Sequence, residues 1–466
     1  MRGESSALFL WAICCIFQIV NFIQGKPMSD TSFATRLYTL ATGEDGARFC
    51  KDIPDSQCND QPVNFVLQIV SQAFSKTGDA LADAKVVLPW LIGAVGAPVF
   101  LIGFLVPIRE SLALLPQILV GGVLRRFAIR KHFWTISSLV EGVCIAGMAF
   151  VGLSGLQGHA AGWAIVALLV LFSLARGVAS IAAKDVLGKT VSKTRRGRVS
   201  GYAATISGVA ASLVGFYLAF APSEVRPDWM LYVLLFGASL TWLLAAGSYA
   251  QLQEHEGATE GGQTLQDVFR DQLRTLMSDR DLQRFLLART FMISTALMGP
   301  LFVALAQRES GTELSSLGWL MLATGLAGAL SSSIWGWFSD ISSRRTMAYA
   351  AGGAGLLGGL TLLILYLAPG LAGTVYFYAG LVFLLGVSHS GVRIGRKTHI
   401  VDMAGKDKKA EYVALSNSII GVLLLILGVF SGLTLALGLE FGIAVLSVLA
   451  LLGAGTALTM RDVQTE

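Results

Sequence analysis

Charged side chains interrupt several apolar segments of this chain, where hydrocarbon would surround them. A charge in such a place costs at least about 2–3 kcal/mol, so it faces other helices, finds a partner and marks a substrate or ion pathway. The chemistry suggested is binding and proton exchange, because cations hold anionic groups and carboxylates carry protons. The candidates are Lys76, Asp79, Asp83, Arg109, Glu110, Glu141, Arg176, Arg289, His389 and Arg393.

Spacing relates the first five of these residues. On a helix with about 3.6 residues per turn, Lys76, Asp79 and Asp83 project within roughly a 60° arc, as one polar stripe. Lys76 can also reach Asp79, one turn away. Arg109 and Glu110 are adjacent and point about 100° apart, so we expect at least one of them to meet another helix.

Two interpretations of these charges stay open from the sequence. In the first, they line a central polar cavity in which Arg109 or Arg176 binds an anionic group. Glu110, Asp79 or Glu141 would then take up a coupling proton. In the second, they form fixed ion pairs between helices and only hold the bundle together.

Two loops repeat one pattern of glycine and charged residues. One contains Gly122, Arg126, Arg130 and Lys131, and the other, 214 positions later, contains Gly336, Asp340, Arg344 and Arg345. Lys76 and Arg289 match at a separation of 213. A membrane protein built from two equivalent halves holds its solute at their interface. We therefore expect Lys76 and Arg289 to form two gates, each neutralised by acids of the opposite half in one state.

The segment GWFSDISSRR at 336–345 resembles the signature loop between the second and third helices in each half of the major facilitator superfamily. The resemblance extends over nearly the whole chain from about residue 63. It implies two six-helix bundles that move a solute by alternating access. It also implies that Asp340 pairs with a cation or a helix N-terminus on a neighbouring helix, and that Arg344 and Arg345 hold the loop in the cytoplasm.

The first-half loop departs from the family pattern, because Arg126 stands where the family usually has Asp. Either this contact is rebuilt with an acidic or carbonyl partner, or the loop is only a basic anchor. The fifth helix, SGYAATISGVAASLVG, lacks the Gly-Pro pair of the family's antiport signature. Drug–proton antiport is therefore less favoured.

The composition is that of a membrane protein. Of 466 residues, 54% are hydrophobic and 14% are charged, with mean hydropathy +0.65. Soluble domains have about 25% charged residues. The net charge of +5 does not indicate nucleic-acid binding, because the basic residues fall in the gaps between apolar runs.

No enzyme motif is evident in the sequence. The five histidines are scattered, and Cys50 and Cys58 have no nearby histidine pair that would complete a metal site. We expect no catalytic residues, no metal and no cofactor.

Apolar runs long enough to cross a bilayer, about 20 residues each, number twelve. They lie near 64–89, 96–121, 133–153, 162–182, 200–221, 229–250, 285–306, 315–338, 346–368, 373–394, 411–434 and 438–460. We predict an all-α polytopic membrane protein of twelve transmembrane helices in two pseudo-symmetric six-helix bundles.

Basic residues concentrate in alternate gaps, at 125–131, 184–198, 344–345 and 396–409. Cytoplasmic loops carry such an excess of Lys and Arg. We therefore expect both ends of the twelve-helix unit to be cytoplasmic, in an inner or plasma membrane.

The expected segments follow from these spans. Residues 1–27 are a signal peptide, a signal anchor or a stretch before a translation start at Met28. The others are a cytoplasmic tail (28–62), the first bundle (63–250), a linker with an amphipathic helix (251–283), the second bundle (284–461) and a short tail (462–466).

The function predicted is secondary active transport of a small anionic or zwitterionic solute by rocking of the two bundles, with protons as the coupling ion. We expect a monomer in the lipid bilayer, with no nucleic-acid partner. The alternatives are a facilitator without ion coupling and, less favoured, a membrane-embedded enzyme acting on lipid-linked substrates.

Overall fold

The computed structural model describes residues 34–35, 38–39, 59–115, 123–124, 126–192, 195–225, 227–257, 259, 274–404 and 409–464. Every regular element in these ranges is a helix. Residues 1–27, Gly122, Cys50 and Cys58 lie outside the described residues, as does most of the linker segment predicted to form an amphipathic helix.

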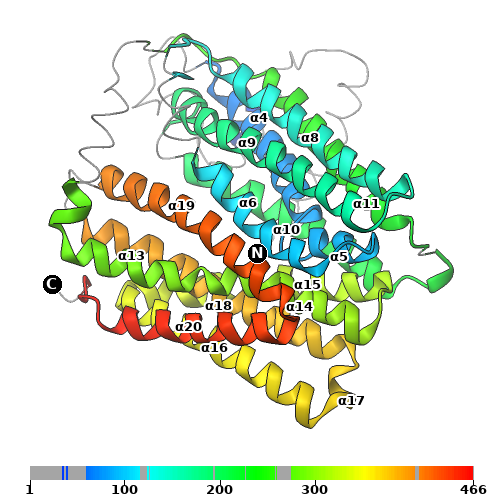
Figure 1. Ribbon diagram of the computed structural model, residues 1–466. Coiled ribbons are helices and arrows are strands. Elements are labelled where there is room, and N and C mark those ends of the chain that lie inside the picture. Colours follow the sequence, from blue (N-terminus) through cyan, green and yellow to red (C-terminus); the bar gives the residue numbers. More distant parts are fainter. Residues whose placement is uncertain are drawn as a thin grey trace.

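The first group of helices forms the upper layer in Figure 1. It consists of α4 (Gln61–Leu81), α5 (Val87–Ala94), α6 (Ile102–Leu114), α8 (Lys131–Leu153), α9 (Gly158–Thr190), α10 (Arg196–Phe220) and α11 (Met230–Ala250). Two short 3₁₀ turns, Val99–Leu101 and Ser223–Val225, join its members.

The second group forms the lower layer. It consists of α13 (Arg280–Met292), α14 (Ser294–Ser310), α15 (Leu314–Ile341), α16 (Ser343–Leu367), α17 (Pro369–Ala372), α18 (Val375–Met403), α19 (Lys409–Ala436) and α20 (Leu439–Leu458).

The predicted fold class is confirmed. Ten helices in the described ranges are long and apolar enough to cross a membrane, with α13 and α14 counted as one. The other two of the twelve predicted spans correspond to α4 with α5 and to α6. Leucine, phenylalanine and valine side chains on the outer faces, such as Phe150 and Leu356, are exposed, as lipid contact requires.

The first predicted span, 64–89, is not one continuous helix, which corrects the sequence interpretation. α4 ends at Leu81, and only the last residues of the predicted span, from Val87, belong to α5. The break is stabilised by Asp83, whose Oδ1 accepts the N–H groups of Lys85 at 2.7 Å and Val86 at 3.1 Å. An aspartate at a helix start satisfies N–H groups that have no partner within the helix. Asp83 therefore caps the turn at 84–86 that leads into α5, and it lies beyond the end of α4 at Leu81 rather than in a polar stripe on that helix.

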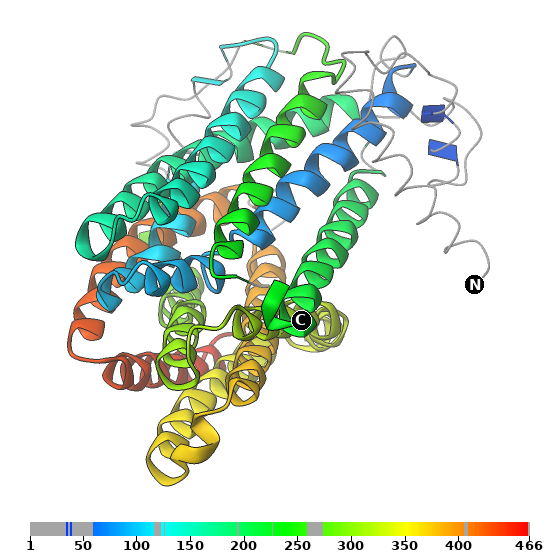
Figure 2. The same cartoon turned by 90° about the vertical axis from the view of Figure 1, so that its right-hand side faces the viewer.

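The two layers meet along two helix pairs, α10 with α15 and α6 with α19, and α5 also packs on α14 (Figures 1 and 2). Small residues allow close approach of backbones, as is common between membrane helices. A Cβ built on Gly318 of α15 would lie 2.3 Å from the backbone N of Ala219 in α10. A Cβ on Gly103 of α6 would lie 2.7 Å from the N of Gly432 in α19.

The α10–α15 contact is closed at one end only. Gly215 of α10 touches α15, but at Gly208 and Gly201, on nearly the same face of α10, an added Cβ would have no described atom within 4 Å. Gly336 lies five turns beyond Gly318 on the same face of α15 and is also free of neighbours among the described atoms. The helices therefore diverge toward the end at which Arg130 and Arg344 lie, here called the basic end.

Candidate functional site

A network of charged side chains lies inside the first bundle. Asp79 of α4 accepts hydrogen bonds from Arg109 of α6, at 2.7 Å, and from Arg176 of α9. The side chains of Asp79 and Arg109 are 24% and 20% exposed, so this network remains in contact with solvent-accessible space. The expectation that one residue of the Arg109–Glu110 pair meets another helix is confirmed by the Arg109–Asp79 contact.

Arg176 extends the network to two further helices. It donates to Ser75 Oγ at 2.8 Å and lies 3.5 Å from Glu141 Oε2. Glu141 is completely buried, and its Oε1 has no hydrogen-bond partner among the described residues. The guanidinium of Arg109 also lies 4.8 Å from the centre of the Phe172 ring, a cation–π contact.

Lys76 does not form the expected ion pair with Asp79, because both carboxylate oxygens of Asp79 face arginines. The amino group of Lys76 makes no ion pair with the residues the structure describes and is partly exposed. Glu110 is exposed on α6 and interacts electrostatically with Arg289 of the second bundle.

Arg289 of α13 is held by neutral groups. Its guanidinium donates to Ser416 Oγ and, at 3.0 Å, to Asn417 Oδ1, both on α19. Its side chain is buried, and its Nε has no partner within the described ranges. Lys76 and Arg289, which match in the sequence, therefore have different surroundings.

His389 of α18 connects the two bundles. Its Nε2 lies 3.1 Å from Lys85 Nζ, in the break between α4 and α5, and its Nδ1 lies 3.1 Å from Thr295 Oγ1 of α14. Because an ammonium group can only donate, Nε2 accepts, and Nδ1 carries the proton that is donated to Thr295. This contact requires a neutral imidazole.

Sequence reasoning missed Lys85 as a site residue. The available signal was a lysine inside a segment predicted to span the membrane. The sequence pattern places Arg396 and Lys397 in the basic gap at 396–409. In the structure, α18 continues to Met403, so both residues lie within a helix.

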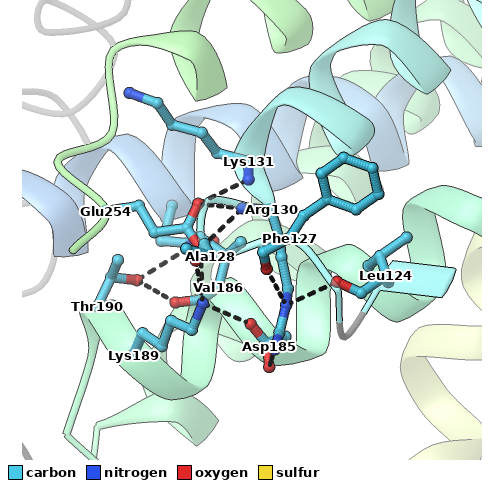
Figure 3. Close-up of polar contacts among 11 residues, drawn as sticks. Leu124, Phe127, Ala128, Arg130, Lys131, Asp185, Val186, Lys189, Thr190 and Glu254 are labelled. Atoms are coloured by element: carbon cyan, nitrogen blue, oxygen red, sulfur yellow. Dashed lines mark hydrogen bonds and ion pairs between the residues drawn. The ribbon is translucent and has the colours of Figure 1, made fainter. Parts of the chain in front are cut away.

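The loop before α8 is bound to the ends of two other helices (Figure 3). Arg130 pairs with Asp185 of α9 and donates from Nε to the carbonyls of Leu124 and Phe127, each at 3.1 Å. Glu254, just after α11, accepts the backbone N–H of Arg130 at 2.9 Å.

Two lysines complete this network. The backbone N–H of Lys131 donates to Glu254 at 2.6 Å, and its Nζ donates to the carbonyl of Leu252 at 2.6 Å. Lys189 Nζ lies 2.9 Å from Glu254. The side chain of Arg126 is exposed and makes no hydrogen bond or ion pair with described residues. The sequence predicts an acidic or carbonyl partner for the contact at Arg126. In the structure it is Arg130 that pairs with an acid, Asp185.

The second-half loop has a related arrangement. Arg344, at the start of α16, pairs with Asp462 at 3.0 Å and donates to the carbonyl of Met460 at 2.8 Å, just after α20. The side chains of Asp340 and Arg345 are exposed and make no hydrogen bond or ion pair with any described residue. The contact of Asp340 with a cation or a helix N-terminus, which the resemblance implies, is not formed between described residues.

In both halves, then, an arginine at the start of the third helix binds an acid of its own bundle, and an acid just beyond the sixth helix takes part. These contacts stay within one bundle and hold each bundle together at its basic end.

Comparison with known proteins agrees with this architecture. Residues 284–465 match the family model described as Major Facilitator Superfamily. No curated protein sequence matches the chain.

Solved structures match over most of the chain. A POT family transporter in complex with a thioalcohol-conjugated peptide is similar with a TM-score of 0.63 and 11% identity, over 85% of this chain and 95% of that one. The nucleoside transporter NupG is similar with a TM-score of 0.60 and 12% identity, over 85% and 97%. A bacterial metal transporter is similar with a TM-score of 0.54 and 15% identity, over 85% and 98%. At these identities the likeness establishes the fold.

Proposed function

Because this chain is a member of the major facilitator superfamily, we propose that it is a secondary active transporter that moves a small solute by alternating access of its two bundles. The family implies a solute transporter rather than an enzyme. The proposal adds the mechanism, the coupling to protons and a cytoplasmic orientation of the basic end.

The observation that carries the mechanism is the one-sided contact between α10 and α15. Gly215 and Gly318 bring the helices together at one end, whereas Gly208 and Gly336 on the same faces have no described neighbours. Rocking one bundle against the other would close the basic end and open the opposite end. On this proposal the structure corresponds to the state in which the basic end is open.

Two side chains that could take up a proton, Glu141 and His389, support proton coupling. Glu141 is fully buried with Oε1 unpaired among the described residues, so this oxygen can take a proton without losing a hydrogen bond. His389 can bind Lys85 only while its Nε2 is unprotonated, so a proton there would release a contact between the bundles.

An uncoupled facilitator is favoured by one observation. Asp79 is held by two arginines, Arg109 and Arg176, which makes it a fixed structural anion. The two functions differ in the pH dependence of exchange, which only the coupled transporter has.

The mechanism is tested by two cysteine pairs in a cysteine-free background. Ser212 and Gly325 face each other at the closed end, where a Cβ on Gly325 would lie 3.2 Å from Ser212 Oγ. By continuing the antiparallel pairing, Gly201 and Gly336 face each other at the basic end. We expect oxidation to cross-link Ser212→Cys with Gly325→Cys, and the Gly201→Cys and Gly336→Cys pair to cross-link only when the basic end closes.

The substrate is sought with a thermal-shift screen of the purified protein against metabolites at two pH values, followed by uptake into proteoliposomes. Each cross-link should stop uptake, and reduction should restore it. Uptake that continues with either pair oxidised would exclude alternating access between these helices.

A further inference from the structure

One face of α18 is lined with cations. Positions 389, 393, 396 and 397 fall within an arc of about 100° on a helix. This face is directed toward the first bundle, because His389 contacts Lys85 there at 3.1 Å. Arg393, Arg396 and Lys397 are here called the cationic face of α18.

A cation of the first bundle lies opposite. Lys76 of α4 interacts electrostatically with Arg393 and with Lys397. Arg393 and Lys397 are exposed and Lys76 is partly exposed, so these groups border accessible space. In the described residues, none of the four cations forms an ion pair.

The nearby acids do not balance these charges. Asp79 interacts with Lys76 but is bound by Arg109 and Arg176. Glu110 of α6 interacts with Arg396 across the bundle interface, and it also interacts with Arg289. Cations that gather around accessible space without paired acids attract an anion from solution, which then supplies the counter-charge.

We propose that the cationic face of α18 and Lys76 together bind a small anion that carries at least two negative charges. The proposal rests on the transport function proposed above and names the substrate class of that site. Arginine forks suit carboxylate and phosphate oxygens, and two charges are needed to satisfy cations on both bundles at once. Without the anion, like charges oppose closure of the basic end, and the bound anion draws the bundles together.

The test uses the full-length protein in detergent, with inorganic phosphate, succinate and acetate as probes in thermal-shift titrations at constant ionic strength. We expect phosphate or succinate, but not acetate, to raise the melting temperature. The two probes distinguish a phosphate ligand from a dicarboxylate. Replacing Arg393→Gln and Lys397→Gln together should weaken binding by at least about tenfold, the effect of losing one charge-assisted hydrogen bond.

Two further variants keep the result interpretable. Lys184→Gln removes the exposed lysine that corresponds to Lys397 in the first bundle, and it should bind like the parent protein. Lys76→Gln weakens the same site from the opposite bundle, should the double variant fail to fold. An equal response to all three probes, or equal weakening by Lys184→Gln, would show general ionic effects and overturn the proposal.

The two proposals fail separately. If a neutral solute is taken up at the parent rate by the Arg393→Gln and Lys397→Gln protein, the anion site is wrong and transport stands. If polyvalent anions bind through these residues but cross-linking leaves uptake unchanged, the site stands and alternating access fails.

Discussion

At the scale of single residues, position in space decides what each charged group does. Asp79 and Asp83 are one turn apart in the sequence, but Asp79 binds two arginines of other helices and Asp83 caps the turn before α5. Glu141 is buried beside Arg176 with one oxygen unpaired among the described residues. The residue type therefore identifies a candidate, and the neighbours define its role.

Replacing Asp79 by asparagine should destabilise the protein. The change leaves Arg109 and Arg176 without their shared anion, and we expect a loss of about 1–3 kcal/mol, reduced by partial exposure, measured as a lower melting temperature. Asp83→Asn is the matched control, because the amide oxygen can still accept the backbone N–H groups of Lys85 and Val86. Equal losses in both variants would contradict the assigned roles.

Glu141→Gln should act on coupling more than on stability. The amide keeps the size of the side chain but cannot take up a proton, and Arg176 retains Asp79 as its anion. We expect the pH dependence of uptake to flatten while the melting temperature changes little. Glu309→Gln, at the end of α14 opposite the basic end, should leave the pH profile unchanged. A normal profile in Glu141→Gln would remove this residue from the proton pathway.

At the scale of elements, the helices are positioned by close glycine contacts and by polar networks at the basic end. Gly318 packs against the α10 backbone, and Arg130 ties the loop before α8 to α9. Both contacts join segments that are far apart in the chain. A substitution that removes either contact therefore tests how the helices pack, and not whether they form.

Arg130→Ala should cost about 2–3 kcal/mol, because it removes the partly buried ion pair with Asp185 and two bonds to carbonyls. Arg126→Ala removes the same charge from an exposed position and should change stability by less than about 0.5 kcal/mol. Thermal melting of the two variants in the same detergent gives the comparison. A larger loss of stability in Arg126→Ala would show that Arg126, and not Arg130, holds the loop before α8 in place.

Gly318→Ala should separate α10 from α15 at the closed end, because its Cβ would meet backbone atoms of Leu218 and Ala219. We expect a loss of about 1–3 kcal/mol and weaker cross-linking between Ser212→Cys and Gly325→Cys. Gly328→Ala has open space among the described atoms, so it should be neutral or stabilising by about 0.5–1 kcal/mol.

At the scale of the whole molecule, two bundles meet along α10–α15 and α6–α19 and each is latched at its basic end. The proposed alternating access requires such a division into two units whose interface can open. The orientation in the membrane sets which side the open end faces.

The orientation is checked by labelling single cysteines in intact cells, again without native cysteines. Glu313→Cys lies between α14 and α15, at the end opposite the basic end, and should react with an impermeant maleimide added outside. Arg126→Cys should react only after the membrane is permeabilised. The reverse pattern would invert the proposed sidedness.

The sequence by itself determined the class of protein, ten of the twelve predicted spans and the two loops at which the pattern of charges repeats. These follow from hydropathy and length, which are local properties of the sequence and decide whether a segment can cross a bilayer. It also indicated Arg109 as a residue with a partner on another helix, but not that Asp79 is that partner.

The tertiary structure alone decided which charges are paired. The Arg109–Asp79 bond joins residues 30 positions apart, and the Lys85–His389 contact joins residues 304 positions apart. Helical spacing cannot predict such contacts, because they depend on how separate helices turn toward one another. The same applies to the break after α4, where a side-chain cap competes with continuation of the helix.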